Sequence, residues 1–307
     1  MPRLTAIVPA TDRPATLARC AEAIRSAESP PEEVVVVDGP PEAGPAQARN
    51  AGAREAAGEV LVFVDADVLV RRDAFTRIRN AFDSDPGLSA LFGSYDDAPE
   101  DPGTVSTFRN LLHHYVHQSS PGPAMTFWAG LGAVRRDAFL AAGGFDQERF
   151  RVPSVEDIDL GMRLAGAGHR ILLDPLLQGT HLKAWSIGQM VRTDFSRRGV
   201  PWIGLLLRDR DRASNSALNL GWRHRLSALA CLIGLGAVVM RRPRTLVAMA
   251  IALVALNRPL YRMLGRRGLP TAAAGIGLHA LHHLTAAAAV PAGVIAHAVD
   301  EGVGRSA

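Results

Sequence analysis

The sequence predicts an α/β protein with a mostly parallel sheet, followed by C-terminal membrane helices. Short apolar runs alternate with helix-patterned segments through the first part of the chain, as in sheets with helices on both faces. Several of these runs end at a turn or at carboxylates, where open α/β sheets bind ligands. Beyond about residue 222, three long apolar segments contain no acidic residue.

Each strand and helix has its own signal. The unbroken β-branched run Val34–Val37 suits a parallel strand that is buried on both faces. Leu17, Cys20, Ala23 and Ile24 have the spacing of one helix face. On such patterns we expect strands at Leu4–Pro9, Val34–Val37, Val60–Val64, Leu88–Gly93 and Arg170–Leu173, and helices at Ala15–Ala27, Ala46–Ala57, Arg72–Phe82, Phe108–Gln118 and Val155–Ala165.

Composition narrows the function. The net charge of +4 is mild and no long basic run is present, so we expect no nucleic-acid partner. Cys20 and Cys231 are the only cysteines, which argues against a disulfide framework or a cysteine metal site. Lys183 is the only lysine among many arginines, so a single arginine carries less weight than usual.

The most informative motif is Asp65-Ala66-Asp67, which directly follows the apolar run Val60–Val64. Two carboxylates at the end of a buried strand repel each other unless a cation lies between them, and hard divalent cations prefer oxygen ligands. A metal held in this way is suited to binding a diphosphate. The alternative is a polar turn with two solvated aspartates.

Several further motifs resemble those of family-2 glycosyltransferases, which have the GT-A fold. They occur in the family's order across roughly residues 4–183, and one departs from its pattern because Asp38 stands where two adjacent acids are usual. The motifs are Ile7-Val8-Pro9-Ala10-Thr11-Asp12-Arg13-Pro14, Val35-Val36-Val37-Asp38-Gly39, Ala48-Arg49-Asn50-Ala51-Gly52, Asp65-Ala66-Asp67, Gly143-Gly144-Phe145-Asp146, and Glu156-Asp157-Ile158-Asp159-Leu160 with Arg163.

The resemblance implies a nucleotide-sugar donor and a divalent cation, Mg²⁺ or Mn²⁺. Asp67 would bind the metal directly, and Asp65 would lie near the ribose or reach the metal through water. His181 would be another metal ligand, although an ordinary loop histidine is the alternative. The donor base would lie against Pro9, Ala10 and Asp38. A carboxylate at Asp38 can accept an N–H from uracil or guanine, so UDP and GDP donors both remain open.

On the acceptor side, the resemblance favours Asp157 as the general base. Attack by the acceptor hydroxyl that it activates, opposite the leaving group, would invert the anomeric centre. Glu156 and Asp159 are rivals, and the helix dipole that favours a charged Asp157 also allows a plain helix cap. Arg163 either faces the acceptor or pairs with Asp159 one turn earlier. In the expected acceptor pocket, Trp128 either stacks on a sugar or lipid headgroup or belongs to the core. Glu156, Arg163 and Trp128 are thus candidate substrate-binding residues.

The membrane prediction rests on Leu226–Met240, Thr245–Asn257 and Thr271–Val299. Only the third reaches the ~20 residues that a membrane-spanning helix needs. For the first two segments the alternatives are tilted spans, a re-entrant hairpin, helices at the membrane interface, or two soluble helices. We therefore expect a catalytic domain at residues 1–215, with an interfacial stretch near 185–210, and membrane-embedded helices at 216–307.

Arginines suggest the orientation. Arg258, Arg262, Arg266 and Arg267 precede the last segment and place its start in the cytoplasm. The same rule prefers a shallow hairpin for the first two segments, because Arg241, Arg242 and Arg244 would otherwise lie outside. The catalytic domain would face the cytoplasm at a bacterial inner membrane and act on a lipid or lipid-linked acceptor.

The stretch near residues 185–210 favours transfer of a single sugar over polymer synthesis. Similar processive synthases carry a Gln-x-x-Arg-Trp motif, whereas Gln189 and Arg192 are here followed by Thr193. Two other functions remain as alternatives. A membrane-anchored nucleotide-sugar-binding protein without turnover would be expected to lose Asp67 or Asp157. A sugar nucleotidyltransferase needs a Gly-rich phosphate loop after the first strand, which Pro9–Pro14 does not provide.

Overall fold

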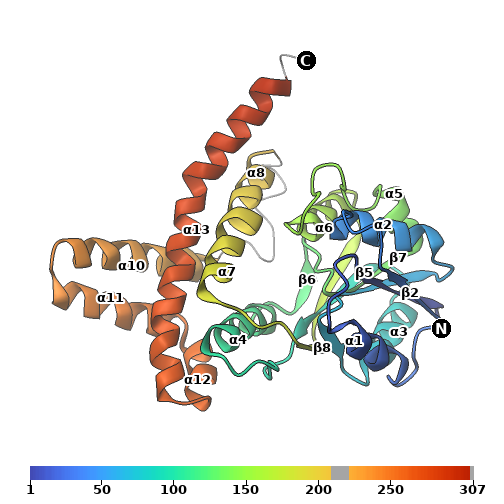
Figure 1. The fold of residues 1–307 in the computed structure, drawn as a ribbon, viewed down its shortest axis with the longest axis horizontal. Coiled ribbons are helices and arrows are strands. Elements are labelled where there is room, and N and C mark those ends of the chain that lie inside the picture. Colours follow the sequence, from blue (N-terminus) through green and yellow to red (C-terminus); the bar gives the residue numbers. More distant parts are fainter. Residues whose placement is uncertain (209–220, 305–307) are drawn as a thin grey trace. The chain divides into compact units, whose positions relative to one another are not determined.

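The computed structural model describes residues 1–208 and 221–304, with side chains to residue 299, and divides into two compact units (Figure 1). Among the described residues, the first unit consists of Met1–Glu100 and Val116–Lys183. The second consists of Asp101–Tyr115, 184–208 and 221–304. The predicted boundary between residues 215 and 216 lies outside the described residues, so the domain limits stay a prediction. Residues 184–208, predicted as an interfacial stretch, group with the C-terminal helices.

The first unit is built on one eight-stranded mixed sheet with the order β2-β1-β3-β7-β5-β8-β4, and β6 pairs with β8. β2, β1 and β3 are parallel, as are β5 and β8, which confirms the predicted mostly parallel α/β sheet. The strands are β1 (Leu4–Pro9), β2 (Glu33–Val37), β3 (Val60–Val64), β4 (Val68–Val70), β5 (Leu88–Tyr95), β6 (Gly122–Ala124), β7 (Leu131–Arg135) and β8 (Arg170–His181).

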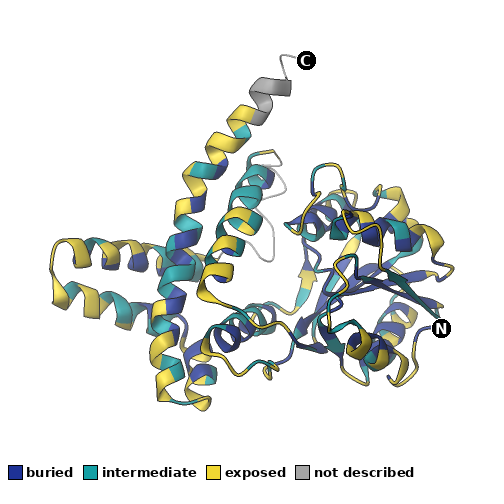
Figure 2. Cartoon of the chain, in the orientation of Figure 1, coloured by how far each residue is buried: buried dark blue, intermediate teal, exposed yellow. Residues whose placement is uncertain are grey.

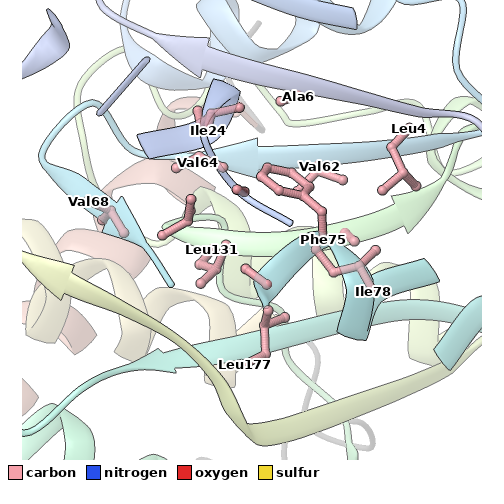
Figure 3. Close-up of a cluster of buried hydrophobic side chains, with 14 of the residues drawn as sticks. Leu4, Ala6, Ile24, Val62, Val64, Val68, Phe75, Ile78, Leu131 and Leu177 are labelled. Carbon is pink, nitrogen blue, oxygen red and sulfur yellow. The ribbon is translucent and has the colours of Figure 1, made fainter. Parts of the chain in front are cut away.

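Helices cover both faces of this sheet because its central strands are apolar on both sides. Along β3, Val60, Val62 and Val64 face one hydrophobic cluster, whereas Leu61 and Phe63 face a second. Figure 3 shows the first cluster, where Phe75 and Ile78 lie against the sheet. The helices of this unit are α1 (Leu17–Arg25), α2 (Pro45–Glu55), α3 (Ala74–Ser84), α5 (Arg136–Ala141) and α6 (Glu156–Gly166).

Three strands were not expected from the sequence. β7 lies antiparallel between β3 and β5 and separates the two parallel parts of the sheet. β4 and β6 are only three residues long, too short to show a periodic pattern. β4 pairs with the far end of β8, which therefore continues to His181 instead of ending near Leu173. The extension of β8 therefore depends on tertiary pairing with β4.

The second unit is helical and has its own core, in which Phe108, Leu111, Leu260 and Leu264 are buried together. Helix α4 (Thr104–Gln118) contributes most of its length here before it continues into the first unit. The other elements are α7 (Ile187–Arg192), the π-helix η1 (Thr193–Gly199), α8 (Val200–Arg208), α10 (Trp222–Val239), α11 (Pro243–Leu256), α12 (Arg258–Arg266) and α13 (Leu269–Gly304).

Among the described residues, one helix is long and apolar enough to cross a membrane: α13, over Leu269–Val299. α11 and α12 meet this criterion only as a pair, and an 89° bend separates them. The predicted segments Leu226–Met240 and Thr245–Asn257 form a helical hairpin, α10–α11. The third predicted segment, Thr271–Val299, lies within α13.

Candidate functional site

Predicted donor-site residues meet at the carboxyl ends of neighbouring strands of the first unit. Pro9 ends β1 and is paired with Val37, the last residue of β2. The Ala10 N–H donates to the Val37 carbonyl at 2.8 Å. Asp38 follows β2 and is exposed, and Asp65 follows β3, the other neighbour of β1. The strand order thus gathers Pro9, Ala10, Asp38 and Asp65 along one edge of the sheet.

Asp67 lies beside His181, as the metal prediction requires. The Asp67 Oδ2 and His181 Nε2 atoms are 3.6 Å apart, because Val68 and His181 are partners in the β4–β8 ladder. Burial acts to raise the pKa of Asp67, but the neighbouring His181 and the charge of Lys183 outweigh it and lower the pKa. Asp67 is therefore held as a carboxylate.

An aromatic wall extends from His181. The Tyr95 ring stacks on the His181 imidazole with centroids 4.1 Å apart, and it also meets the Trp128 ring at 4.9 Å in an edge-on contact. Trp128 is half-buried and also contacts His117. Its indole folds over Gly130, where a Cβ would lie 2.4 Å from the ring. Trp128 therefore packs on the protein with one side while part of it remains accessible.

Arg49 on α2 connects the strand-end aspartates to α6. Its Nη2 donates to Asp65 Oδ1 at 2.7 Å, and its Nη1 donates to Glu156 Oε1 at 2.9 Å. The Arg49 side chain is 6% exposed. Burial alone would lower the pKa of Arg49, but the nearby Asp65, Glu156 and Asp157 carboxylates raise it. Burial raises the pKa of Asp65, and the Arg49 ion pair opposes this shift.

The first turn of α6 places two carboxylates with different surroundings. Glu156 is buried, and its second oxygen accepts the Ser154 N–H at 2.8 Å. Both Glu156 oxygens therefore bind groups of the protein. Asp157 is half-buried and accepts N–H groups from Ala129, at 3.2 Å, and Ile158, at 2.8 Å. The Ala129 bond ties the start of α6 to the Trp128 segment.

Arg163 stabilises the turn that follows α5. Its Nε pairs with Asp159 at 2.8 Å, the one-turn pairing that the sequence allowed. Its two terminal nitrogens donate to the carbonyls of Ala142 and Gly144. Gly144, in the left-handed region with φ 68°, lies against Asn50, where a Cβ would be 2.6 Å from the amide oxygen. These bonds give Arg163 a structural role, and acceptor binding by Arg163 stays a prediction.

The predicted three-residue metal set of Asp65, Asp67 and His181 is not assembled. Among residues 1–208 and 221–299, no three His, Cys, Asp or Glu side chains are arranged to hold a metal ion. Asp65 is instead paired with Arg49. The Asp67–His181 pair still fits a divalent cation, because Mg²⁺ commonly binds one or two protein ligands together with phosphate oxygens and waters.

Sequence reasoning missed two residues of this site, Arg49 and Tyr95. Arg49 lies in a recognised motif, but the abundance of arginine reduced its weight. Its position in a helix that packs against a buried strand was a usable signal, since a buried arginine needs carboxylate partners. Tyr95 lies two residues beyond the predicted end of its strand. Its contact with His181 depends on the β5–β8 pairing, which the sequence did not indicate.

Comparisons with known proteins agree with this geometry. Residues 40–141 match the model of glycosyl transferase family 2. No curated protein matches the chain. Among solved structures, the mannosyltransferase PcManGT from Pyrobaculum calidifontis, in complex with GDP-Man and Mn²⁺, is 17% identical with a TM-score of 0.54, over 94% of this chain and 87% of that chain. GalNAc-T7 with UDP, GalNAc and Mn²⁺ is 13% identical with a TM-score of 0.48, over 73% and 53%.

The family match contains Asp65 and Asp67, and PcManGT shares the fold. Residues 40–141 therefore resemble family-2 glycosyltransferases, and the chain has a GT-A fold, which it shares with PcManGT.

Proposed function

We propose that the protein transfers one sugar from a UDP- or GDP-sugar to a lipid or lipid-linked acceptor, with a divalent cation and inversion of the anomeric centre. The observation that carries this proposal is the linked set of charges at the sheet edge. Asp67 contacts His181, and Arg49 joins Asp65 to the helix that begins with Glu156 and Asp157. Donor and acceptor groups are thus supported by one buried ion-pair network.

The strand ends would hold the donor. Pro9, Ala10 and Asp38 would contact the base, and Asp65, fixed by Arg49, would face the ribose. Asp67 and His181 would hold Mg²⁺ or Mn²⁺ against the diphosphate. When bound, the cation supplies positive charge that stabilises the departing diphosphate. The PcManGT complex contains GDP-Man and Mn²⁺, which supports this class of donor and ion.

Asp157 would act as the base. The acceptor oxygen attacks the anomeric carbon, the bond from that carbon to the diphosphate breaks, and the hydroxyl proton passes to the Asp157 carboxylate. Glu156 is less suited, since it is buried and its charge is paired with Arg49. Trp128, next to the Asp157 partner Ala129, would contact the acceptor.

The second unit suggests where the acceptor comes from. Its helices carry exposed large apolar side chains, and α13 has the length of a membrane span. We place the protein at a bacterial inner membrane with the catalytic domain on the cytoplasmic side, where nucleotide sugars are available.

Purified full-length protein with a panel of nucleotide sugars and a lipid extract tests this function. We expect release of UDP or GDP that stops in excess chelator and returns with Mg²⁺ or Mn²⁺. Activity that is undiminished in chelator would exclude the metal role. Tight nucleotide-sugar binding without any release, with or without lipid extract, would instead support a binding protein.

A further inference from the structure

Two elements of the second unit are candidates for insertion into the lipid bilayer. α13 has the length of a span, and the α10–α11 hairpin has an apolar surface. In Figure 1 the hairpin runs across the direction of α13. The contacts agree, because α11 meets α12 at 89° and α12 packs against α13, where Leu264 lies against Gly275. Elements that cross each other in this way cannot both span one bilayer.

Many residues of the hairpin are exposed (Figure 2), and about half of the large exposed apolar side chains of the described residues lie on it. Leu235 is 49% exposed, Val239 76% and Ile251 64%. The full set on α10, α11 and the turn between them is Trp222, Leu226, Leu229, Leu232, Ile233, Leu235, Val238, Val239, Met240, Leu246, Val247 and Ile251. Small residues such as Gly234 and Ala237 face inward between the two helices. A helix that is apolar all round is suited to protein interiors or membranes, not to a water interface.

α13 presents a different surface. From residue 270 to residue 289 it carries no exposed large apolar side chain within the described part of the helix. Its exposed residues there are Pro270, Ala273, Ala274, Gly277 and Ala288. Apart from Leu269, the first residue of α13, the large exposed apolar residues of its described part lie between Val290 and Val299, a stretch of about 14 Å of helix. That length is roughly half of a hydrocarbon core.

Charged side chains also lie on the elements that pack against α13. His282 Nδ1 contacts Asp194 of η1 at 2.7 Å, and Asp194 pairs with Arg109 of α4 at 2.5 Å. η1 lies directly against α13, since a Cβ at Gly199 would be 2.5 Å from the Ala289 Cβ. A spanning α13 would carry η1, with Arg197 and Arg198, to mid-bilayer depth. Charges at that depth are strongly unfavourable.

The hairpin has the opposite charge pattern. No charged residue lies within 226–240 or 245–257, and the uncharged part of α10, residues 226–239, is about 21 Å long. Exposed Arg241, Arg242 and Arg244 form its tip, and Trp222 and Arg225 lie exposed at its base. Arginine and tryptophan at the two ends of an apolar length are typical of the two headgroup layers.

We propose that the α10–α11 hairpin, and not α13, inserts into the lipid bilayer, tip first, while α13 lies at the membrane surface. The occupant of the hairpin surface is lipid hydrocarbon, and anionic headgroups pair with the arginines at the tip and base. This inference rests on the membrane association proposed above. It replaces both the shallow hairpin and the spanning last helix that the arginine pattern suggests.

The hairpin base explains why insertion is compatible with the buried polar groups of this unit. Asn257 donates to Ser227 at 2.9 Å, and His279 contacts both Tyr261, at 3.1 Å, and His283, at 3.1 Å. These bonds join α10, α11, α12 and α13 where the hairpin begins. With the hairpin inserted, this polar cluster lies at headgroup level, and the hydrocarbon contacts only apolar side chains.

Depth measurements on the full-length chain test the proposal. Cys20 and Cys231, both buried, are replaced by alanine, and single cysteines at Leu235, Ile251, Gly277 or Ala288 carry an environment-sensitive fluorophore. The proteins are reconstituted into vesicles of phosphatidylcholine and phosphatidylglycerol. We expect nitroxide groups deep in the acyl chains to quench probes at 235 and 251, and aqueous iodide to quench probes at 277 and 288.

The reverse pattern, with 277 and 288 quenched by deep nitroxides, would overturn the proposal in favour of a spanning α13. Hairpin probes that are quenched by iodide, or shielded from iodide and nitroxide lipids alike by a second copy of the chain, would overturn it as well.

A charge-insertion pair gives an independent measurement. Leu235→Arg should reduce the vesicle-bound to free ratio in flotation by on the order of 100-fold, and Ala288→Arg should change it little. Equal losses would contradict the proposal. Nucleotide-sugar turnover of the same variants in detergent micelles reports separately on glycosyl transfer, so failure of the two proposals can be distinguished.

Discussion

Arg49 Nη2 lies 2.7 Å from Asp65 Oδ1, and this contact joins the end of β3 to α2. Because the same guanidinium binds Glu156 at 2.9 Å, the proposed donor and acceptor sides of the site share one buried cation. Arg49 therefore holds both Asp65 and Glu156 in place, although nothing in the motif Asp65-Ala66-Asp67 indicates that an arginine pairs with it.

Removing the Arg49 charge should destabilise the first unit. In Arg49→Met, Glu156 keeps a buried charge without its partner, which typically costs ~3–5 kcal/mol of unfolding free energy. Denaturant unfolding, followed by circular dichroism, measures this cost. The double variant Arg49→Met/Glu156→Gln should recover much of the loss. A double variant that is as unstable as the single one would contradict this account.

Loss of the Asp67 carboxylate should abolish transfer without unfolding the protein. Asp67→Asn removes the charge beside His181 and should lower turnover by about 100-fold or more, the scale of one electrostatic stabiliser. The matched control is Asp73→Asn, whose carboxylate pairs with Arg77 at 2.6 Å outside the site. Comparable turnover in the two variants would remove Asp67 from the mechanism.

Asp157→Asn separates catalysis from helix capping. An asparagine oxygen can still accept an N–H from Ala129 or Ile158, so the fold and nucleotide affinity should persist. Transfer should fall by ~10²–10⁴, as for a general base. Calorimetric titration with UDP or GDP and a turnover assay measure the two properties. Near-normal turnover would leave Asp157 as a helix cap and move the base elsewhere.

The position of α6 depends on Gly161. A Cβ at this residue would lie 2.2 Å from the Phe127 nitrogen and 2.4 Å from the Thr126 carbonyl carbon. Gly161→Ala should therefore displace the helix that carries Asp157 and lower stability by ~1–3 kcal/mol. Gly188→Ala, where nothing lies within 4 Å, is the control and should be neutral or slightly stabilising. A lower melting temperature for Gly161→Ala alone is the expected result.

The Asp194 network should make the second unit acid-sensitive. Burial acts to raise the pKa of Asp194, but the His282 hydrogen bond and the Arg109 and Arg198 charges lower it to about 2, from 3.8. A depressed folded-state pKa contributes stability above pH ~4 that is lost as the pH falls toward ~2. The contribution is on the order of 2 kcal/mol.

Unfolding of the wild type and of Asp194→Asn, compared from pH 5 to pH 2, measures this effect. The stability difference between the two proteins should shrink across that interval. A difference that stays constant with pH would show that Asp194 does not titrate there.

Local sequence signals were sufficient for much of the fold. The runs Val34–Val37 and Val60–Val64 form β2 and β3, and Ala46–Ala57 contains α2. Asp65-Ala66-Asp67 could be placed at a strand end because a buried strand has an unmistakable apolar pattern. The short strands β4 and β6 could not be predicted, since three residues have no periodicity and their hydrogen bonds come from β8.

The sequence by itself determined most of the helices and long strands, the order of the motifs and the identity of the chemical groups. Only the tertiary structure decided which groups meet. His181 reaches Asp67 because β8 continues past its local apolar pattern to pair with β4. Arg49 lies between Asp65 and Glu156 because α2 packs beside β1 and delivers a buried cation there. Such contacts depend on strand pairing and burial over long sequence separations, which no local pattern encodes.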